Sequence, residues 1–286
     1  MKFEDNSPSI YYTPKCPPIQ CFNGTVTLKG KLKYGSIFTV NNMIFKAAAT
    51  EKIRALFADS QDTLVWSCLD GTMGGFYADE EEKSASASIG DFCFLAGVPC
   101  RELVENVTRD YIIMVPQDKA WFELIADVWG QKANKITRYA TKKENTFDVE
   151  FLKKAALPSG FEIRPIDRDL FDYCKTAWCR DFVAQYDTFK QFEELGLGFV
   201  ITKDGVPVSG ASSYSSYKGG IEIQVDTKSG FRRQGLAFCA CAELILECLK
   251  RGIFPSWDAH NLSSLMLSRK LGYEFAYSYT AYEIKK

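Results

Sequence analysis

One stretch near residue 230 restricts the fold more than any other part of the chain. Alternating residues at 221–227 predict a strand, and the apolar run at 238–249 predicts a helix. Between them lies the short basic turn Arg232-Arg233-Gln234-Gly235-Leu236-Ala237. A turn that leads from a strand into a helix directs backbone amides and the positive end of the helix dipole to one place. The order therefore predicts an α/β (α+β) fold with a phosphate-binding turn.

Length and charge limit the class of protein. A chain of 286 residues can hold two domains, and 46% hydrophobic residues suffice for sizeable cores. The net charge of −1 argues against a nucleic-acid partner, which needs a basic surface. No apolar run is long enough to cross a bilayer, and residues 1–5 lack the apolar core of a signal peptide. We therefore expect a cytoplasmic protein without a membrane partner.

The cysteines and the histidine argue against a metal site. The chain has ten cysteines but no Cys-x-x-Cys pair, and His260 is its one histidine. Several cysteines lie in apolar runs, where a free thiol behaves as a small buried hydrophobic group. We therefore expect free thiols and no bound metal.

The pattern of residues predicts three parts. Residues 1–42, rich in Pro, Asn, Gly, Lys and Tyr, predict an N-terminal extension. Residues 43–157 predict a smaller α/β domain, with strands at 63–68 and 111–115 and a helix at 117–129. A Leu-Pro-Ser-Gly break ends at Gly160, and residues 160–286 predict the second domain. In that domain residues 263–271 predict a helix, and residues 273–284 a last strand or pair of strands.

The second domain resembles the GNAT acetyltransferase family. The hallmark turn of that family is Gln/Arg-x-x-Gly-x-Gly/Ala, and Arg232, Gly235 and Ala237 occupy its positions. A second marker follows at the expected distance, with Asn261 after a strand and Gly272-Tyr273 after a helix. The match covers residues 198–286. The predicted domain at 43–157 has an alternative interpretation as a degenerate copy of the same fold.

The resemblance implies a GNAT fold with a mixed central sheet and acetyl-CoA as cosubstrate. In this family the amides of the turn bind the pyrophosphate, the glycine lets the backbone approach closely, and arginine adds charge-assisted bonds. The strand before the turn pairs with the pantetheine amides, and the asparagine contacts the pantetheine arm. The implied cofactor-binding residues are Val225, Thr227, Arg232, Arg233, Gln234, Gly235, Leu236, Ala237 and Asn261.

Three short segments are similar to one branch of the family in particular. They are Val-Asp-Thr at 225–227, Arg-Arg-x-Gly-Leu-Ala at 232–237 and Trp-Asp-Ala-His-Asn at 257–261. That branch includes the acetyltransferase that confers resistance to the antibiotic zwittermicin A. The similarity implies a small-molecule amine as acceptor, either an antibiotic or a metabolite.

Acetyl transfer to an amine requires a base, because an alkyl amine has a pKa of about 10.4 and is protonated near neutral pH. Glu222 is the predicted base, since it lies on the strand where many family members place a carboxylate or a histidine. It falls one residue from the usual position, which a β-bulge would correct. The alternative is a strand carboxylate bound to a neighbour. His260 is the second candidate, and a structural role is its alternative.

One position departs from the family pattern. Many members carry a tyrosine seven residues after the motif asparagine, as proton donor to the thiolate, whereas this chain has Ser268. Tyr273, Tyr279 and Tyr282 are the possible substitutes. We predict an N-acetyltransferase that moves an acetyl group from acetyl-CoA to a small-molecule amine. The alternative is a catalytically weak or inactive acyl-CoA-binding sensor or scaffold. Aminoacyl transfer from a charged tRNA is disfavoured by the near-neutral charge and the intact turn.

Overall fold

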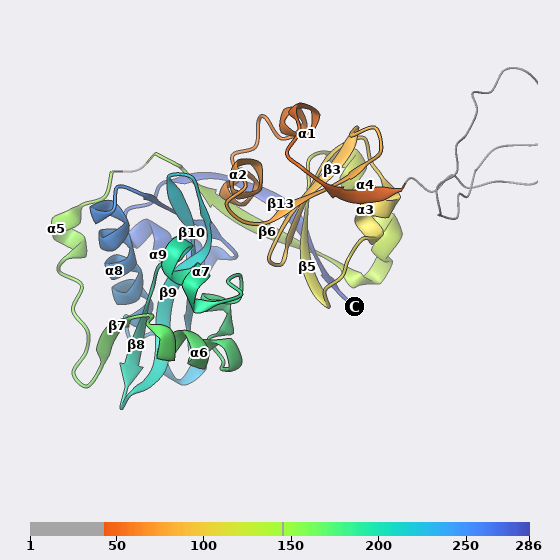
Figure 1. The fold of residues 1–286 in the computed structure, drawn as a ribbon. Helices are drawn as coiled ribbons and strands as arrows, with labels where there is room; N and C mark the ends of the chain where they lie inside the picture. Colours follow the sequence, from red (N-terminus) through yellow and green to blue (C-terminus); the bar gives the residue numbers. More distant parts are fainter. Residues whose placement is uncertain (1–42, 145) are drawn as a thin grey trace, which may run out of the picture. The chain divides into compact units, whose positions relative to one another are not determined.

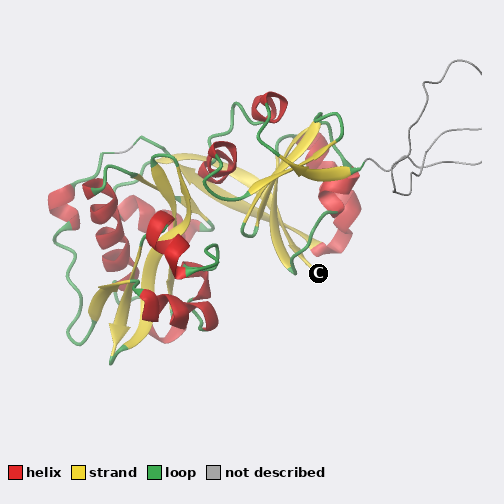
Figure 2. Cartoon of the chain, viewed as in Figure 1, coloured by secondary structure: helices red, strands yellow, loops and turns green. Residues whose placement is uncertain are grey.

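Two mixed β-sheets organise the residues that the computed structural model describes, 43–144 and 146–286 (Figures 1 and 2). The predicted extension at 1–42 lies outside these residues. The eight-stranded sheet has the order β1-β2-β3-β4-β5-β13-β6-β12, and the five-stranded sheet has the order β11-β10-β9-β8-β7. Each sheet contains one parallel pair, β4 with β5 and β10 with β11, and its other pairs are antiparallel.

The elements follow one another along the chain with short connections. The strands are β1 Ile44–Ala47, β2 Gly75–Asp79, β3 Ser84–Ile89, β4 Phe92–Gly97, β5 Tyr111–Pro116, β6 Ala133–Thr141, β7 Glu162–Pro165, β8 Gly198–Lys203, β9 Val206–Tyr217, β10 Gly220–Thr227, β11 Phe254–Ser256, β12 Asp258–Ala259 and β13 Phe275–Lys285. The α-helices are α1 Glu51–Leu56, α2 Thr63–Asp70, α3 Arg101–Glu105, α4 Lys119–Trp129, α5 Val149–Leu152, α6 Arg168–Thr176, α7 Phe189–Leu195, α8 Leu236–Lys250 and α9 Leu262–Lys270.

The last strands of the chain return to the first sheet. β13 pairs antiparallel with both β5 and β6, and the short β12 pairs with β6 (Figure 1). The eight-stranded sheet is therefore built from residues on both sides of the predicted boundary at 157–160. The division into 43–157 and 160–286 stays a prediction, and the strand pairing crosses it.

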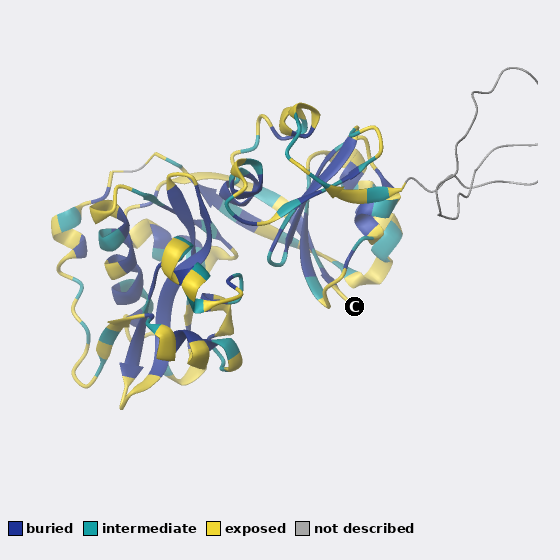
Figure 3. Ribbon diagram, in the orientation of Figure 1, coloured by how far each residue is buried: buried dark blue, intermediate teal, exposed yellow. Residues whose placement is uncertain are grey.

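Aromatic packing joins the two sheets beside the site. Phe92 of β4 meets Tyr214 of β9 edge to face, with ring centroids 5.8 Å apart. The N–H of Asp91 donates to the Tyr214 hydroxyl at 2.8 Å. Strands β9 and β10 are largely buried (Figure 3), and α8 covers the five-stranded sheet with an apolar face that includes Leu244 and Ile245. This packing gives the residues around β10 a rigid support.

The strand predicted at 63–68 is wrong, because residues Thr63–Asp70 form helix α2. The Asp62 side chain caps the start by accepting from the Leu64 N–H at 2.9 Å, and Gly71 ends the helix with φ at 76°. The Ser67 hydroxyl donates to the Ser216 carbonyl of β9 at 2.6 Å. The two caps and the contact with the five-stranded sheet outweigh the weak strand preference of the sequence.

Other predicted elements are confirmed. The strand at 111–115 is β5, the helix at 117–129 is α4, and the strand, turn and helix around residue 230 are β10, the turn at 228–235 and α8. The helix at 263–271 is α9, and the last strand is β13. Of the helices in the described ranges, none is long and apolar enough to cross a membrane.

Gly71 offers a test of the cap that ends α2. Its φ of 76° lies in the left-handed region, and an added Cβ would meet no atom within 4 Å, so only backbone strain opposes alanine there. We expect Gly71→Ala to lower the free energy of unfolding by about 1 kcal/mol in urea denaturation. Gly230→Ala is the matched control, since Gly230 has equal space and no positive φ. Equal stabilities for the two variants would contradict the assignment of the cap.

Candidate functional site

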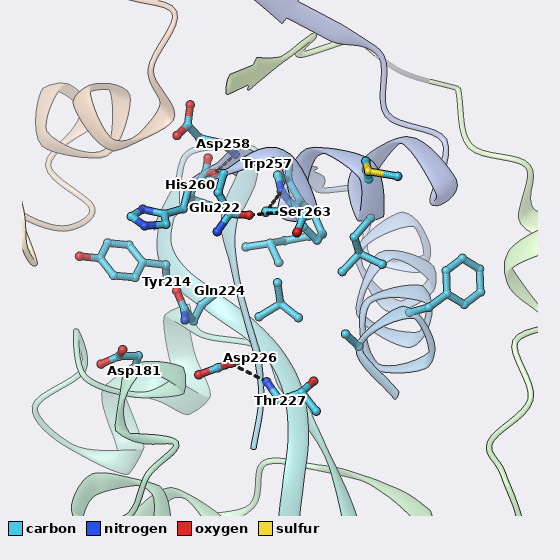
Figure 4. Close-up of a pocket in the computed structure, with 18 of the residues that line it drawn as sticks. Asp181, Tyr214, Glu222, Gln224, Asp226, Thr227, Trp257, Asp258, His260 and Ser263 are labelled. Atoms are coloured by element: carbon cyan, nitrogen blue, oxygen red, sulfur yellow. Dashed lines mark hydrogen bonds between the residues drawn. The ribbon is translucent and has the colours of Figure 1, made fainter. Parts of the chain in front are cut away.

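A cavity of about 1260 Å³ lies where the two sheets meet around β10. One end is formed by β10, the turn that follows it, and α9, and the other end by residues of α2, β4, β5, β6 and β13. Figure 4 shows Glu222, Gln224, Asp226 and Thr227 in succession along β10, with Tyr214 and Asp181 on one side of the strand. The cavity therefore combines the predicted phosphate turn with residues far earlier in the chain.

One edge of β10 is open along the cavity. The parallel neighbour β11 pairs with β10 only from Gly220 to Glu222, whereas β9 pairs on the other side as far as Thr227. A register shift between Glu222 and Ile223 lies where β11 leaves, and its extra residue is Tyr214 on β9. The bulge that would move Glu222 to the usual base position stays a prediction. The strand from residue 223 onward thus offers an edge to an extended ligand.

Alternation along the strand decides which backbone groups face this open edge. The Lys228 N–H donates to the Val208 carbonyl of β9 at 2.9 Å. In an antiparallel pair alternate residues face the partner, so Val225 and Thr227 turn their backbone groups the other way. Side chains already engage Thr227, because its N–H donates to Asp226 and its carbonyl accepts from Arg232 Nε at 3.0 Å. Val225 is the residue whose backbone remains for a ligand.

The turn after β10 has the conformation of an anion-binding site. Arg233 and Gly235 both have positive φ, 65° and 81°. Gly235 precedes the first turn of α8, and no side chain caps the helix there. An added Cβ on Gly235 would meet no protein atom within 4 Å, and the residue lines the cavity. Uncapped amides at a helix start beside open space fit a diphosphate.

The two arginines of the turn have different surroundings. Arg232 is held against the end of β10, with its Nε on the Thr227 carbonyl and its Nη2 3.7 Å from Asp226 Oδ1. Arg233 lines the cavity and forms no ion pair with any residue from 43 onward that the structure describes. Arg233 is therefore the side chain available for an anion, while Arg232 shapes the turn. Gln234 belongs to the turn but is not among the residues that line the cavity.

Asn261 lines the cavity at the start of α9. It caps α9 by accepting from the Ser264 N–H on its Oδ1 at 3.0 Å, which leaves its Nδ2 free of the cap. Leu236, Ala237 and Asn261 all line the cavity. The structure thus places eight of the nine predicted cofactor-binding residues around one cavity; their role stays a prediction.

Glu222 is buried, with 6% of its surface exposed, and both of its carboxylate oxygens are occupied. Oε2 accepts from the Thr63 hydroxyl at 2.5 Å, and Oε1 accepts from the Asp258 N–H at 2.7 Å. These contacts match the alternative interpretation of a strand carboxylate bound to its neighbours. Its role as a base stays a prediction, as does that of His260.

His260 lines the cavity, with 52% of its side chain exposed. Arg138 Nη1 lies 3.2 Å from His260 Nδ1, and because arginine can only donate, Nδ1 accepts. In neutral histidine the proton is then on Nε2, which lies 3.8 Å from Glu283 Oε1. Arg138 also pairs with the Asp258 carboxylate at 2.7 Å. The lone pair of Nδ1 is therefore used by Arg138, whereas Nε2 lies beyond hydrogen-bond distance of Glu283.

The three tyrosines that could replace the missing proton donor lie in different surroundings. Ser268 is fully buried, donates to the Leu265 carbonyl at 2.9 Å, and does not line the cavity. The Tyr273 hydroxyl donates to the Pro255 carbonyl in the core, and Tyr282 packs in a cluster under α4. Tyr279 lines the cavity and accepts from Arg138 Nε at 3.3 Å. Burial raises the pKa of Tyr279, so its hydroxyl keeps its proton.

Asp62 is a cavity residue that the sequence analysis missed. Its Oδ1 caps α2, and Oδ2 has no hydrogen-bond partner among residues 43–144 and 146–286. Burial, followed by the negative charges of Asp258 and Glu222, raises the pKa of Asp62 from 3.8 to about 7. An aspartate before an apolar run is a signal for a helix start, and here it was obscured by the strand predicted at 63–68.

A family model and a related protein both connect this chain with N-acetyltransferases. Residues 54–282 match the model of the family described as GNAT acetyltransferase. The uncharacterized N-acetyltransferase YdfB of Bacillus subtilis (strain 168) is 28% identical over 248 residues, which are 80% of this chain and 94% of that protein. The predicted resemblance to the zwittermicin A branch stays a prediction.

Solved structures share the fold. A crystal structure of a GCN5-related N-acetyltransferase-like protein from Streptococcus suis is 47% identical, with a TM-score of 0.80, and the match covers 84% of this chain and all of that one. A Drosophila protein at 12% identity has a TM-score of 0.52 over 85% of this chain and 98% of its own, which is a likeness of fold alone. The predicted α/β fold of the GNAT type is confirmed.

The raised pKa of Asp62 has a consequence for stability. The folded protein binds a proton at Asp62 more tightly than the unfolded chain, so this group makes stability fall as the pH rises from about 4 to about 7. Asparagine cannot ionise and still caps a helix. We expect Asp62→Asn to gain stability relative to wild type across this range, by at most about 4 kcal/mol.

Urea denaturation at pH values below and above this range measures the difference. Asp62→Ala serves as the control. It should follow the same pH dependence as Asp62→Asn, but its free energy of unfolding should be about 1 kcal/mol lower than that of Asp62→Asn at every pH, because alanine does not cap the helix. A difference between Asp62→Asn and wild type that does not change with pH would contradict the raised pKa.

Proposed function

Because the chain belongs to the GNAT acetyltransferase family, we propose that it transfers the acetyl group of acetyl-CoA to an amine of a small molecule. The observation that carries this proposal is the division of charge along one cavity. Unpaired cations and uncapped amides line the end at the turn, where Asp226 faces Arg232, and the other lining carboxylates gather at the opposite end beside Arg138. The open edge of β10 connects the two ends. An anionic donor and a cationic acceptor would each find the complementary end.

The donor end suits coenzyme A. Arg233, Lys154 and Lys270 line the cavity there, and none of them is ion-paired to another residue that the structure describes. The amides at the start of α8 would hold the diphosphate, with Arg233 adding charge-assisted bonds. The pantetheine amides would pair with Val225 along the open edge, as an added strand does. Asn261 Nδ2 would donate to the same arm from the facing side.

The acceptor end suits an ammonium group. Its carboxylates outnumber its cations, because Arg138 is the one arginine among the lining residues there and is paired with Asp258. Phe92 and Tyr214 form an apolar wall beside them. The carboxylates lining this end are Asp62, Asp91, Asp181, Glu222 and Asp258. We propose a small amine, such as an antibiotic or a metabolite, as the acceptor.

The residues would divide the work of the transfer. Acetyl-CoA supplies an acetyl thioester. A base at the acceptor end takes the proton of the ammonium group, since only the neutral amine is nucleophilic. An N–H on the open edge of β10 would stabilise the oxygen that becomes negative during attack. Tyr279, which keeps its proton, is the tyrosine at the cavity that could stand in for the one replaced by Ser268.

A protein that binds acyl-CoA without turnover is the second candidate. The burial of Ser268 favours it, because this residue stands at the position of the usual proton donor and does not reach the cavity. This candidate shares the donor end and differs only in the chemistry. Binding and turnover therefore have to be measured separately.

Calorimetric titration with acetyl-CoA tests the donor end. We expect binding by the wild type, a loss of about 10- to 100-fold in affinity for Arg233→Ala, and no measurable binding for Gly235→Trp, whose side chain would fill the space over the turn. Arg251→Ala is the control, because Arg251 lies at the far end of α8 and pairs with Glu247. Unchanged binding by Gly235→Trp would exclude the turn as the coenzyme site.

Release of the coenzyme A thiol tests turnover. The wild type should release thiol with at least one amine from a panel of putrescine, spermidine, lysine and glucosamine. Mass spectrometry should show a gain of one acetyl group on the same amine. Coenzyme binding without thiol release from any of them would favour the second candidate.

A further inference from the structure

We propose that Asp62, and not Glu222, takes the proton from the acceptor ammonium, and that Glu222 is a positioning residue. This inference rests on the proposed acetyl transfer. It assigns a catalytic group to helix α2, which lies outside the strand, turn and helix that bind the coenzyme.

One hydrogen bond ties the start of α2 to β10, and two more orient the carboxylates of Glu222 and Asp62. Thr63 follows Asp62 directly and donates its hydroxyl proton to Glu222 at 2.5 Å. The other oxygen of Glu222 accepts from the Asp258 N–H at 2.7 Å. The Asp62 carboxylate is itself oriented by its bond from the Leu64 N–H. The backbone beside Asp62 is thus tied to the strand that carries the open edge.

Glu222 and Asp62 differ in whether a carboxylate oxygen is free to accept a proton. Both oxygens of Glu222 accept protein hydrogen bonds, and these bonds hold its orientation. Asp62 uses only Oδ1 for the cap, so Oδ2 remains for a ligand. The Nδ1 lone pair of His260 already accepts from Arg138, so neutral His260 has no free lone pair to take a proton. Asp62 is therefore the cavity carboxylate best placed to accept a proton.

The surroundings of Asp62 give it suitable proton affinity. Burial and two carboxylates raise the pKa of Asp62 to about 7, near the value that serves a general base at neutral pH, and Lys143 moderates the rise. An ammonium ligand would bring a positive charge to a carboxylate that forms no ion pair with the part of the chain that the structure describes. The titratable groups that face it are Glu222 of β10, Asp258 of β12, Lys143 after β6, Cys68 of α2, and Tyr277 and Tyr279 of β13.

Two protons leave the acceptor nitrogen during acetyl transfer. Ionised Asp62 accepts one proton from the acceptor ammonium and becomes neutral. The amine lone pair then forms the new C–N bond at the thioester carbonyl, and the C–S bond breaks with its electron pair on sulfur. The nitrogen then loses its second proton and the thiolate gains one. The reaction therefore releases one net proton, the one held by Asp62, which passes to solvent before the next turnover.

The test compares the pH profiles of kcat/KM for wild type, Asp62→Asn and Glu222→Gln between about pH 6 and about pH 9, with the amine from the panel that the wild type acetylates fastest. Wild-type activity should rise with pH through about 7, because Asp62 must be ionised to accept the proton. Asp62→Asn should lose about 100-fold or more and lose this rise, while calorimetric binding of acetyl-CoA is retained.

Glu222→Gln separates the two carboxylates. Glutamine can still accept from the Asp258 N–H with its carbonyl oxygen, and its NH2 group can donate to the Thr63 hydroxyl, but the change removes a negative charge that raises the pKa of Asp62. The rise in activity should therefore move to lower pH and remain present. If Glu222 were the base, the rise would disappear in Glu222→Gln and persist in Asp62→Asn, and the inference would be overturned.

Methoxyamine and a distant variant provide the controls. The nitrogen of methoxyamine is already neutral at these pH values, so Asp62→Asn should acetylate it within about fivefold of the wild-type rate. Equal losses with methoxyamine and with the alkyl amine, or loss of acetyl-CoA binding, would show a merely structural role and overturn the inference. Asp118→Asn, in the cap of α4, should match wild type.

Failure of the proposed function would look different. In that case the wild type would acetylate no amine of the panel, and the inference would fall with the function before any variant is compared. When the wild type is active and Asp62→Asn keeps both its rate and its pH profile, acetyl transfer stands and only the role of Asp62 is refuted.

Discussion

The buried carboxylate of Glu222 is the contact on which the site depends. A charged group can be buried only where hydrogen bonds replace its lost hydration, and Glu222 finds them in the Thr63 hydroxyl and the Asp258 N–H. One bond reaches α2 and the other reaches β12, so a single side chain of β10 ties the five-stranded sheet to segments of the other sheet and its helices. The cavity exists where these segments meet.

The early end of β11 explains the open edge of β10. β11 follows β10 only as far as Glu222, and beyond that residue the two strands separate. The separation leaves Val225 with unpaired backbone groups on the side of the cavity, and α8 begins with uncapped amides at the end of the same strand. A strand edge and a helix start are both strong hydrogen-bonding surfaces, and here they line one continuous cavity.

The sequence predicted the strand, turn and helix around residue 230 well because these elements are local. The alternation of β10, the glycine turn and the apolar face of α8 all lie within 31 residues, from Gly220 to Lys250, and each has its own sequence signal. The acceptor end was predicted poorly. Residues 63–68 were assigned to a strand because Thr, Val and Trp favour strands, whereas the Asp62 cap and the contact of Ser67 with β9 form a helix. The side chain that this error concealed was Asp62.

The sequence by itself determined the mixed fold and the strand, turn and helix around residue 230, because periodicity and glycine conformation act over short stretches of chain. Only the tertiary structure decided which carboxylates face the cavity and which tyrosine reaches it. Asp62 and Glu222 are 160 positions apart, and Tyr279 arrives on a strand that returns to the other sheet. Burial and charge at such a site come from packing between distant segments, and no local pattern records them.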